Sequence, residues 1–304
     1  MSTLRRVVDI IGRVLIGLGV LLLLFTAYQI WGTSVQEAHT QSGLRTQLQQ
    51  ETNSDAVRRA LAEESALDKL PTGPAVPAPS TAAPAEGNPI GDIRIPVIGI
   101  NQVVVEGTNT PDLRKGPGHY TGTPLPGQSG NVAIAGHRTT YGHPFYNLDS
   151  VKVGDPIVLT TLQGIFVYDT TKSFVVSPSD TTVVDNVFAD QLTLTTCNPR
   201  FSATSRLVVQ ATLAHSQLFP NSGLRVHPLH SDPKSQSLAG DSDVSYTSTL
   251  LWGFVTALVV TGIFLAAWRF RRQRWVIYGV GAVGTLVLLW FLFGAISPLL
   301  PASF

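Results

Sequence analysis

Charged residues are missing from three long segments of this chain. Residues 14–36, 244–268 and 275–304 contain no Asp, Glu, Lys or Arg. Each segment is long enough to cross a hydrocarbon core of about 30 Å, which takes about 20 helical residues. Helices buried in a protein core are rarely this long without one polar face. The sequence therefore predicts one N-terminal and two C-terminal transmembrane helices.

The two C-terminal segments also lack ionisable residues at bilayer depth, which excludes a transport path or a proton relay within them. Arginines flank the apolar segments, at Arg5, Arg6 and Arg13 and again in the loop 269–274. Positive charge beside a span stays in the cytoplasm. We therefore expect a multi-pass protein of the cell membrane, with a cytoplasmic N-terminus and an extracellular domain between the first two spans.

A small-x-small cleavage site is missing directly after residue 31, so the first span is expected to be an uncleaved signal anchor rather than a cleaved signal peptide. A surplus of basic residues is missing as well. Residues 92–215 hold eight Lys or Arg against nine Asp or Glu. Binding to phosphate backbones requires an excess of cations, so nucleic acid is excluded as a partner.

Cys197 is the only cysteine, and it cannot form a disulfide within the chain. In an oxidising compartment a lone thiol is either a reagent or the partner of a second chain. One buried cysteine without a role is the plain alternative. Metal binding has little support, because no carboxylates with metal-ligand spacing accompany His119, His137 and His143. We expect no metal site and no cofactor.

Composition divides the chain into five parts. They are the N-terminus with the first span (1–36), a polar helical stalk followed by a Pro/Ala-rich linker (37–89), a folded domain (90–215), a flexible polar linker (216–243), and two spans joined by a basic loop (244–304). The linker at 71–89 has the composition of a semi-extended polyproline segment. The stalk and this linker are expected to hold the folded domain away from the bilayer.

Short β-type runs broken by Gly, Pro and Asp fill the folded domain. The expected strands are 93–95, 97–100, 103–106, 131–135, 156–161, 165–168, 172–176, 192–196 and 206–213. Short helical turns are expected at 111–115 and 144–150. Many short strands in one segment predict a mainly β domain, either a closed barrel or a sandwich. The periodicity does not separate these two.

Three reactive side chains lie at the ends of these strands. His137 and Cys197 each follow an apolar strand, and Arg206 opens another. A thiolate attacks an amide carbonyl, an imidazole accepts and returns the proton, and a guanidinium can hold the oxyanion of the tetrahedral intermediate. Together they are the parts of a cysteine acyl-transfer enzyme.

The segments around these residues resemble those of the class E sortases. In chain order the matching segments are 95–100 (IPVIGI), 105–107 (VEG), 116–120 (GPGHY), 135–145 (AGHRTTYGHPF), 192–199 (LTLTTCNP) and 206–209 (RLVV). The match covers about residues 90–213 in the order of the family. The resemblance implies an eight-stranded sortase-type β-barrel and a cysteine transpeptidase.

The resemblance also implies roles for the reactive residues. Cys197 would attack the Thr–Gly bond of a sorting signal, Leu-Ala-X-Thr-Gly in this class, at the C-terminus of a secreted protein. An amine of a peptidoglycan precursor or of a pilin would then resolve the acyl-enzyme. His137 would be the general acid and base, and Arg206 would hold the oxyanion and the substrate.

Three further residues are expected to bind substrate by the same resemblance. Tyr120 matches a tyrosine associated with a preference for Ala over Pro in the signal. Thr196 would line the substrate groove. Asn198 stands where this class usually has His, so substrate handling on that side is expected to differ.

Other functions fit the residues less well. A class C pilin polymerase is the main alternative, because that class carries a C-terminal span, but residues 71–89 lack its Asp-Pro-aromatic lid motif. L,D-transpeptidases have His-Gly directly before the cysteine, where this chain has Thr195-Thr196, and papain-like hydrolases place the cysteine before the histidine. A non-catalytic scaffold with a sortase barrel is the non-enzymatic alternative.

Overall fold

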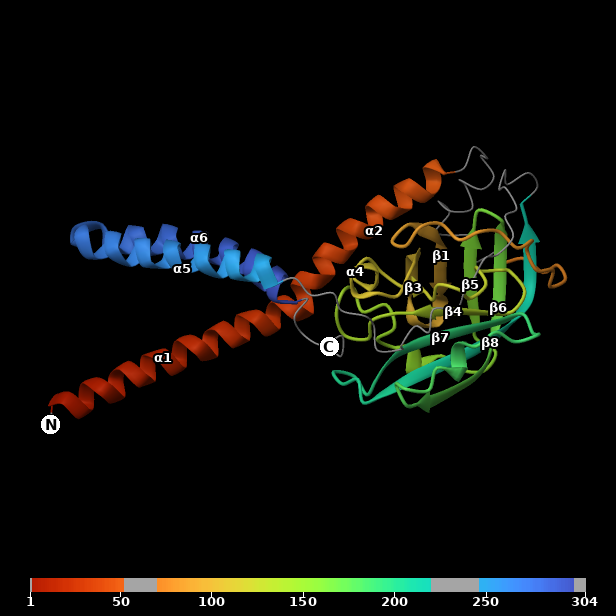
Figure 1. Cartoon of the computed structure of the whole chain (residues 1–304), viewed down its shortest axis with the longest axis horizontal. Helices are drawn as coiled ribbons and strands as arrows, with labels where there is room; N and C mark the ends of the chain where they lie inside the picture. Colours follow the sequence, from red (N-terminus) through yellow and green to blue (C-terminus); the bar gives the residue numbers. More distant parts are fainter. Residues whose placement is uncertain (1, 52–69, 220–245, 298–304) are drawn as a thin grey trace. The chain divides into compact units, whose positions relative to one another are not determined.

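The structure is a computed structural model that describes residues 2–51, 70–219 and 246–297. It divides into two compact units (Figure 1). One unit contains the apolar helices from both ends of the chain. The other contains the β-sheet and nearly all of helix α2 (Thr33–Gln50).

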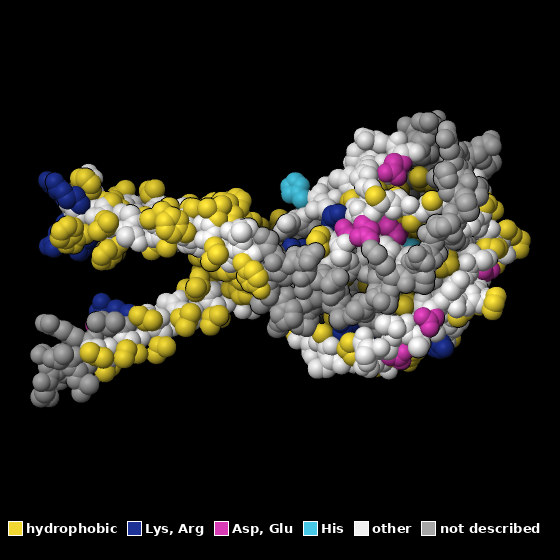
Figure 2. Space-filling view, in the orientation of Figure 1, with side chains coloured by type: hydrophobic (Ala, Val, Ile, Leu, Met, Phe, Trp, Pro, Cys, Tyr) yellow, Lys and Arg dark blue, Asp and Glu magenta, His cyan; other side chains and the backbone are white. Residues whose placement is uncertain are grey.

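The apolar unit consists of helices whose side chains are largely exposed. Its elements are α1 (Ser2–Ala27), a π-helical segment (Tyr28–Gly32), α5 (Tyr246–Arg269), a 3₁₀ segment (Arg271–Gln273) and α6 (Arg274–Ile296). Hydrophobic side chains cover these helices, and basic side chains gather at one end of them (Figure 2). Three helical segments, 7–50, 246–269 and 271–296, are long and apolar enough to cross a membrane.

Aromatic contacts hold the helices of this unit together. Trp252 of α5 stacks on Phe291 of α6, with ring centroids 4.8 Å apart. Tyr28 meets the edge of Trp290 at 5.0 Å. The hydroxyl of Thr249 donates a hydrogen bond of 2.7 Å to the carbonyl of Ala295. Helices α5 and α6 of the hairpin expected for 244–304 therefore pack against each other.

The second unit is built on a closed eight-stranded barrel. Its strands are β1 (Pro89–Ile95), β2 (Ile100–Glu106), β3 (Gly118–His119), β4 (Asn131–Ala135), β5 (Pro156–Thr161), β6 (Gly164–Val176), β7 (Gln191–Asn198) and β8 (Ser205–Leu218). The order around the barrel is β1-β2-β3-β4-β7-β8-β6-β5. The mainly β fold and the eight-stranded barrel are confirmed, and the sandwich is excluded.

Some expected strands differ from the observed ones. The strand predicted at 97–100 is wrong, because Pro96–Ile98 forms a 3₁₀ turn and Gly99 adopts a left-handed φ of 69°. Proline lacks the N–H that a strand would donate, and glycine allows the left-handed turn that starts β2. The runs at 165–168 and 172–176 form the single strand β6, whose pairing with β8 shifts register near Thr170.

The sequence did not predict strand β3, and it predicted two helical turns with slightly different bounds. The two-residue strand β3 was not expected, since two residues carry no periodicity. The helical turns expected at 111–115 and 144–150 correspond to α4 (Thr110–Leu113) and a 3₁₀ turn at Leu148–Ser150.

Strand alternation separates the barrel interior from its outer face. On β4, β7 and β8 the interior positions are apolar and belong to one core: Val132, Ile134, Leu192, Leu194, Leu207, Val209 and Ala211. The positions between them face outward. Ala133, Ala135 and Val208 form a second apolar cluster there with Tyr120. The outer face of these three strands is therefore a buried surface of its own.

Helix α2 packs against β2 of the barrel. Leu44 and Leu48 lie four residues apart and are buried against Val103 and Val105. The side-chain amide of Gln41 donates to the carbonyl of Val103 at 2.9 Å and accepts from its N–H at 2.7 Å. The polar helix expected from residue 37 is present through Gln50, but one of its faces packs against the barrel instead of being solvated. Its apolar residues fall on one helix face and cover the outward side chains of β2.

The Pro/Ala-rich segment also lies on the barrel rather than apart from it. Ala78 donates to the carbonyl of Gly127 at 2.7 Å, and Gln163 donates to the carbonyl of Pro79 at 2.7 Å. The linker predicted for this segment is therefore attached to the barrel by backbone groups of Ala78 and Pro79. The rest of the stalk, at 52–69, and residues 220–243 of the second linker lie outside the described residues.

Leu48→Ala tests the packing of α2. Leu48 is 1% exposed, and removing a buried leucine side chain costs about 2–5 kcal/mol. We expect the barrel of the full chain in detergent micelles to unfold at lower urea concentration, measured by pulse proteolysis. Thr46→Ala, on the exposed face of the same helix, should leave the midpoint unchanged. An unchanged midpoint for Leu48→Ala would contradict the packing.

Candidate active site

Parallel pairing of β4 with β7 aligns His137 with Cys197. The register pairs Ala135 with Thr195. It continues through Gly136, whose N–H donates to the carbonyl of Thr195 at 3.1 Å and whose carbonyl accepts from the hydroxyl of Thr196 at 2.7 Å. His137 and Cys197 are the next residues along the two paired segments. The imidazole and the thiol are thus delivered at the same end of the sheet.

Antiparallel pairing of β7 with β8 brings Arg206 to Cys197. The two residues are direct partners in the register, and the Cβ atoms of such partners lie about 4.5–5.5 Å apart. Arg206 is 7% exposed, and its guanidinium donates to the carbonyls of Ala203 and Ser205 at 3.1 and 3.2 Å. The structure therefore brings together His137, Cys197 and Arg206, the three residues expected to be catalytic.

Tyr120 lies on the same outer face as Cys197. Its hydroxyl is 3.0 Å from that of Thr195, two residues before the cysteine, and its ring is buried. It is close enough to Arg206 and Cys197 to interact electrostatically with both, while burial raises its own pKa to about 12. Tyr120 therefore forms part of the surface beside the thiol.

The other two expected substrate-binding residues lie differently. Thr196 is 3% exposed and its hydroxyl bonds Gly136, so it lies on the interior side of β7. Because strand side chains alternate, Thr195 rather than Thr196 shares a face with Cys197. The side-chain amide of Asn198 is already engaged, accepting from Arg138 at 2.7 Å and donating to Ser205 at 3.1 Å.

The loop after β4 holds His137 against the barrel. A Cβ at Gly136 would lie 2.6 Å from the Phe145 ring, so only glycine allows this close approach. The N–H of Phe145 donates to the carbonyl of His137 at 3.1 Å. The ring of Tyr141 lies 5.2 Å from the imidazole. His137 is thus fixed by packing on both sides, and it is 8% exposed.

Burial disfavours charge on both reactive groups. It lowers the pKa of His137 to about 4, with a further contribution from the nearby Arg114 cation. It also raises the pKa of the Cys197 thiol, against the opposing effect of Arg206 and Arg138. At neutral pH the resting pair is therefore a thiol and a neutral imidazole. Among the described residues, the Nε2 atom of His137 has no hydrogen-bond partner, so it is available to accept a proton.

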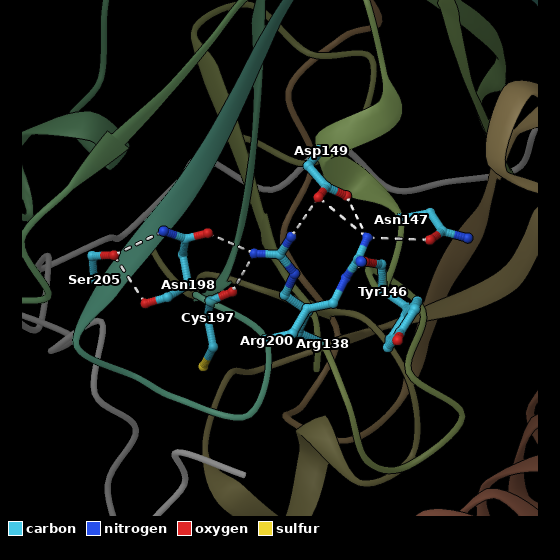
Figure 3. Close-up of polar contacts among 8 residues, drawn as sticks. All are labelled: Arg138, Tyr146, Asn147, Asp149, Cys197, Asn198, Arg200 and Ser205. Carbon is cyan, nitrogen blue, oxygen red and sulfur yellow. Dashed lines mark hydrogen bonds and ion pairs between the residues drawn. The ribbon is translucent and has the colours of Figure 1, made fainter.

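Three charged residues at this site were not expected from the sequence. Arg138, Asp149 and Arg200 form a network next to Cys197 and Asn198 (Figure 3). Arg138 directly follows the histidine within the motif, which was the available signal. Asp149 and Arg200 lie on separate loops and could be linked only by the fold. In the described part of the chain, no group of three His, Cys, Asp or Glu residues could hold a metal ion.

Comparison with known proteins identifies relatives of the barrel. The family model described as the sortase domain matches residues 93–214. Sortase SrtE1 of Streptomyces coelicolor is 31% identical over 66% of this chain and 55% of its own length, so the chain spans about half of that relative. Sortase SrtE2 of the same organism is 26% identical over 70% of this chain and 84% of its own length.

A solved structure of sortase E from Streptomyces avermitilis is similar as well. It is 38% identical to this chain, and the match covers 46% of this chain and 99% of that protein, with a TM-score of 0.41.

The pH dependence of Cys197 alkylation tests the electrostatics of the site. Only the thiolate reacts, and burial raises the pKa of this thiol. The iodoacetamide rate should therefore keep rising above pH 9. Arg206→Gln removes a cation that favours the thiolate, so it should move the profile to still higher pH. Lys172→Gln, an exposed position on β6, should not move it. A wild-type profile that levels off well below pH 9 would contradict the assignment.

Proposed function

Because the chain belongs to the sortase family, as a member of its class E, we propose that it is a cysteine transpeptidase. Cys197 cleaves a sorting signal between Thr and Gly and passes the protein to an amine of the cell wall. The observation that supports this most directly is the strand register, which pairs Cys197 with Arg206 and aligns it with His137. The register delivers a nucleophile, a cation and a base at one sheet end.

The first half of the reaction forms the acyl-enzyme. His137 accepts the thiol proton at Nε2, and the Cys197 thiolate attacks the carbonyl carbon of the signal threonine. The negative charge moves to the carbonyl oxygen, where the Arg206 guanidinium stabilises it. His137 then gives the proton to the departing glycine amine. The products are a thioester on Cys197 and a free peptide that begins with glycine.

The second half transfers the acyl group. An amine of a peptidoglycan precursor or a pilin attacks the thioester carbon and loses a proton to His137. The C–S bond breaks, and the Cys197 thiolate regains its proton from His137. Because burial disfavours the charged form of both groups, the thiolate and the imidazolium form together when the proton moves from Cys197 to His137.

The signal is Leu-Ala-X-Thr-Gly, and the surface beside the thiol supports this choice. Tyr120 and Thr195 share a hydroxyl contact on the face that carries Cys197. The neighbouring outward residues Ala133 and Ala135 pack with Tyr120 in one apolar cluster beside the thiol. Tyr120 is the residue proposed to favour Ala over Pro. Thr196 has no part in this surface.

The catalytic domain lies outside the cell, anchored by three spans. The helices are long and apolar enough for this role. Basic residues flank them at 5–13 and 269–274, and such clusters stay cytoplasmic. Secreted proteins with a C-terminal signal and wall amines are both available on the outer side.

Peptide cleavage by the full chain in detergent micelles tests the reaction. With a fluorogenic Leu-Ala-X-Thr-Gly peptide and an added amine, wild type should release the glycine-containing fragment and form the ligated product. The Cys197→Ala variant should cleave the peptide at least 10³-fold more slowly, because the covalent step needs the thiolate. Tyr120→Phe should reduce the preference over a Leu-Pro-X-Thr-Gly peptide. Absence of cleavage with both peptides would favour the non-catalytic scaffold.

Cysteine labelling tests the orientation. In a Cys197→Ala background, Val153→Cys on the barrel, where Val153 is 73% exposed, should react with a membrane-impermeant maleimide in intact cells. Gln273→Cys in the basic loop should react only after the cells are lysed. The reverse pattern would place the barrel in the cytoplasm and contradict the proposed access to secreted proteins.

A further inference from the structure

We propose that Arg138 is a positioning residue of this site. Its guanidinium fixes the Cys197 end of β7 to the loop that carries His137, and it supplies positive charge beside the nucleophile. The inference deepens the proposed function and rests on its assignment of Cys197 and His137.

Arg138 connects the base to the backbone of the nucleophile. It directly follows His137 in the chain, and it is 4% exposed. Its Nη1 atom donates to the carbonyl oxygen of Cys197 at 3.1 Å and to the side-chain oxygen of Asn198 at 2.7 Å. Arg138 is thus joined to His137 by the peptide bond and to the end of β7 by two hydrogen bonds. Movement of one reactive group relative to the other must stretch these bonds.

A second set of contacts orients the guanidinium. Nη2 of Arg138 lies 3.0 Å from a carboxylate oxygen of Asp149, which stands on the 3₁₀ turn Leu148–Ser150. Arg200, from the loop after β7, bonds the same carboxylate at 2.9 Å. Arg200 also donates to the carbonyl of Tyr146 at 3.1 Å. Asp149 therefore links the loop after β4 to the loop after β7.

The hydrogen bonds continue to the strand that carries Arg206. Asn198 donates to the hydroxyl of Ser205, which in turn donates to the carbonyl of Asn198 at 2.9 Å. Ser205 is the residue before Arg206. In Figure 3 the Arg138 guanidinium lies between the β7 end and Asp149, while the Cys197 sulfur points away from the network. Arg138 therefore acts through the backbone and through its charge, and not by touching the thiol.

The charge of Arg138 distinguishes it from a simple structural clamp. Burying a guanidinium is costly, so packing alone would be met better by an apolar residue. The titratable and charged groups around the thiol are Arg206 on β8, His137 and Arg138 after β4, and Tyr120 after β3. Arg206 and Arg138 both oppose the rise in thiol pKa that burial causes. Asp149 offsets part of the Arg138 charge.

Two substitutions in this network should shift the pH profile of Cys197 alkylation in opposite directions. In the full chain in micelles, Arg138→Gln keeps a donor near the Cys197 carbonyl but removes the charge. Its alkylation profile should shift to higher pH, with about three- to tenfold slower reaction at pH 8. Asp149→Asn keeps Arg138 and removes the offsetting carboxylate, so its profile should shift to lower pH. Lys172→Gln is the control for loss of a distant cation.

Peptide kinetics add a readout for positioning. Arg138→Gln should lower kcat at least tenfold with KM nearly unchanged, because misplacement of the nucleophile affects the chemical step. Arg138→Lys retains the charge but not the two-sided geometry. It should restore the alkylation profile and leave kcat reduced.

Several results would overturn the proposal. One is an Arg138→Gln variant that has the melting temperature of wild type and an unchanged alkylation profile. Arg138 would then have only a structural role. Another is an Asp149→Asn variant whose alkylation profile is unchanged or shifted to higher pH. This second test still applies if Arg138→Gln does not fold. Alkylation needs no peptide. Opposite shifts in a protein that cleaves neither signal would therefore refute the proposed function and leave only the effect of the Arg138 charge on the thiol standing.

Discussion

The parallel pairing of β4 with β7 is the contact on which the site depends. The paired residues are 60 positions apart in the sequence, and strands β5 and β6 lie between them. Parallel strands end at the same side of a sheet, so the residues that follow Ala135 and Thr195 come out together. The hydrogen bonds of Gly136 extend the pairing to the last residue before the reactive groups. A slip of one residue would turn Cys197 into the barrel.

The two faces of β7 serve different purposes because of this pairing. Inward residues Leu192 and Leu194 join the core, while Thr193, Thr195 and Cys197 face outward. On the outward face Thr193 and Thr195 are as buried as the interior residues, whereas Cys197 is partly exposed. Burial keeps the thiol and the imidazole neutral, and the arginines around them limit how far the thiol pKa rises. Reactivity is thus set by a balance of desolvation and nearby positive charge.

Much of this arrangement could be predicted from the sequence, and the remainder shows what local patterns omit. Apolar runs ending in His137 and Cys197 predicted strands with reactive ends, and alternation predicted a mainly β domain. The number of strands came from family resemblance, since β3 has two residues and carries no periodic signal. Thr196 was placed in the groove because it adjoins the cysteine, whereas strand alternation gives that place to Thr195. Asp149 and Arg200 could not be linked, since their contact depends on loop conformations set by the whole barrel.

Gln41 also protects an unpaired part of strand β2. β3 pairs with only the last two residues of β2, so the backbone of Val103 faces an open edge. Such edges are templates on which other chains add as strands and aggregate. The side-chain amide of Gln41 presents one donor and one acceptor to Val103, as a neighbouring strand residue would. Helix α2 thereby closes a gap in the sheet, and its removal would leave the backbone groups of Val103 unpaired at an edge where another strand could add.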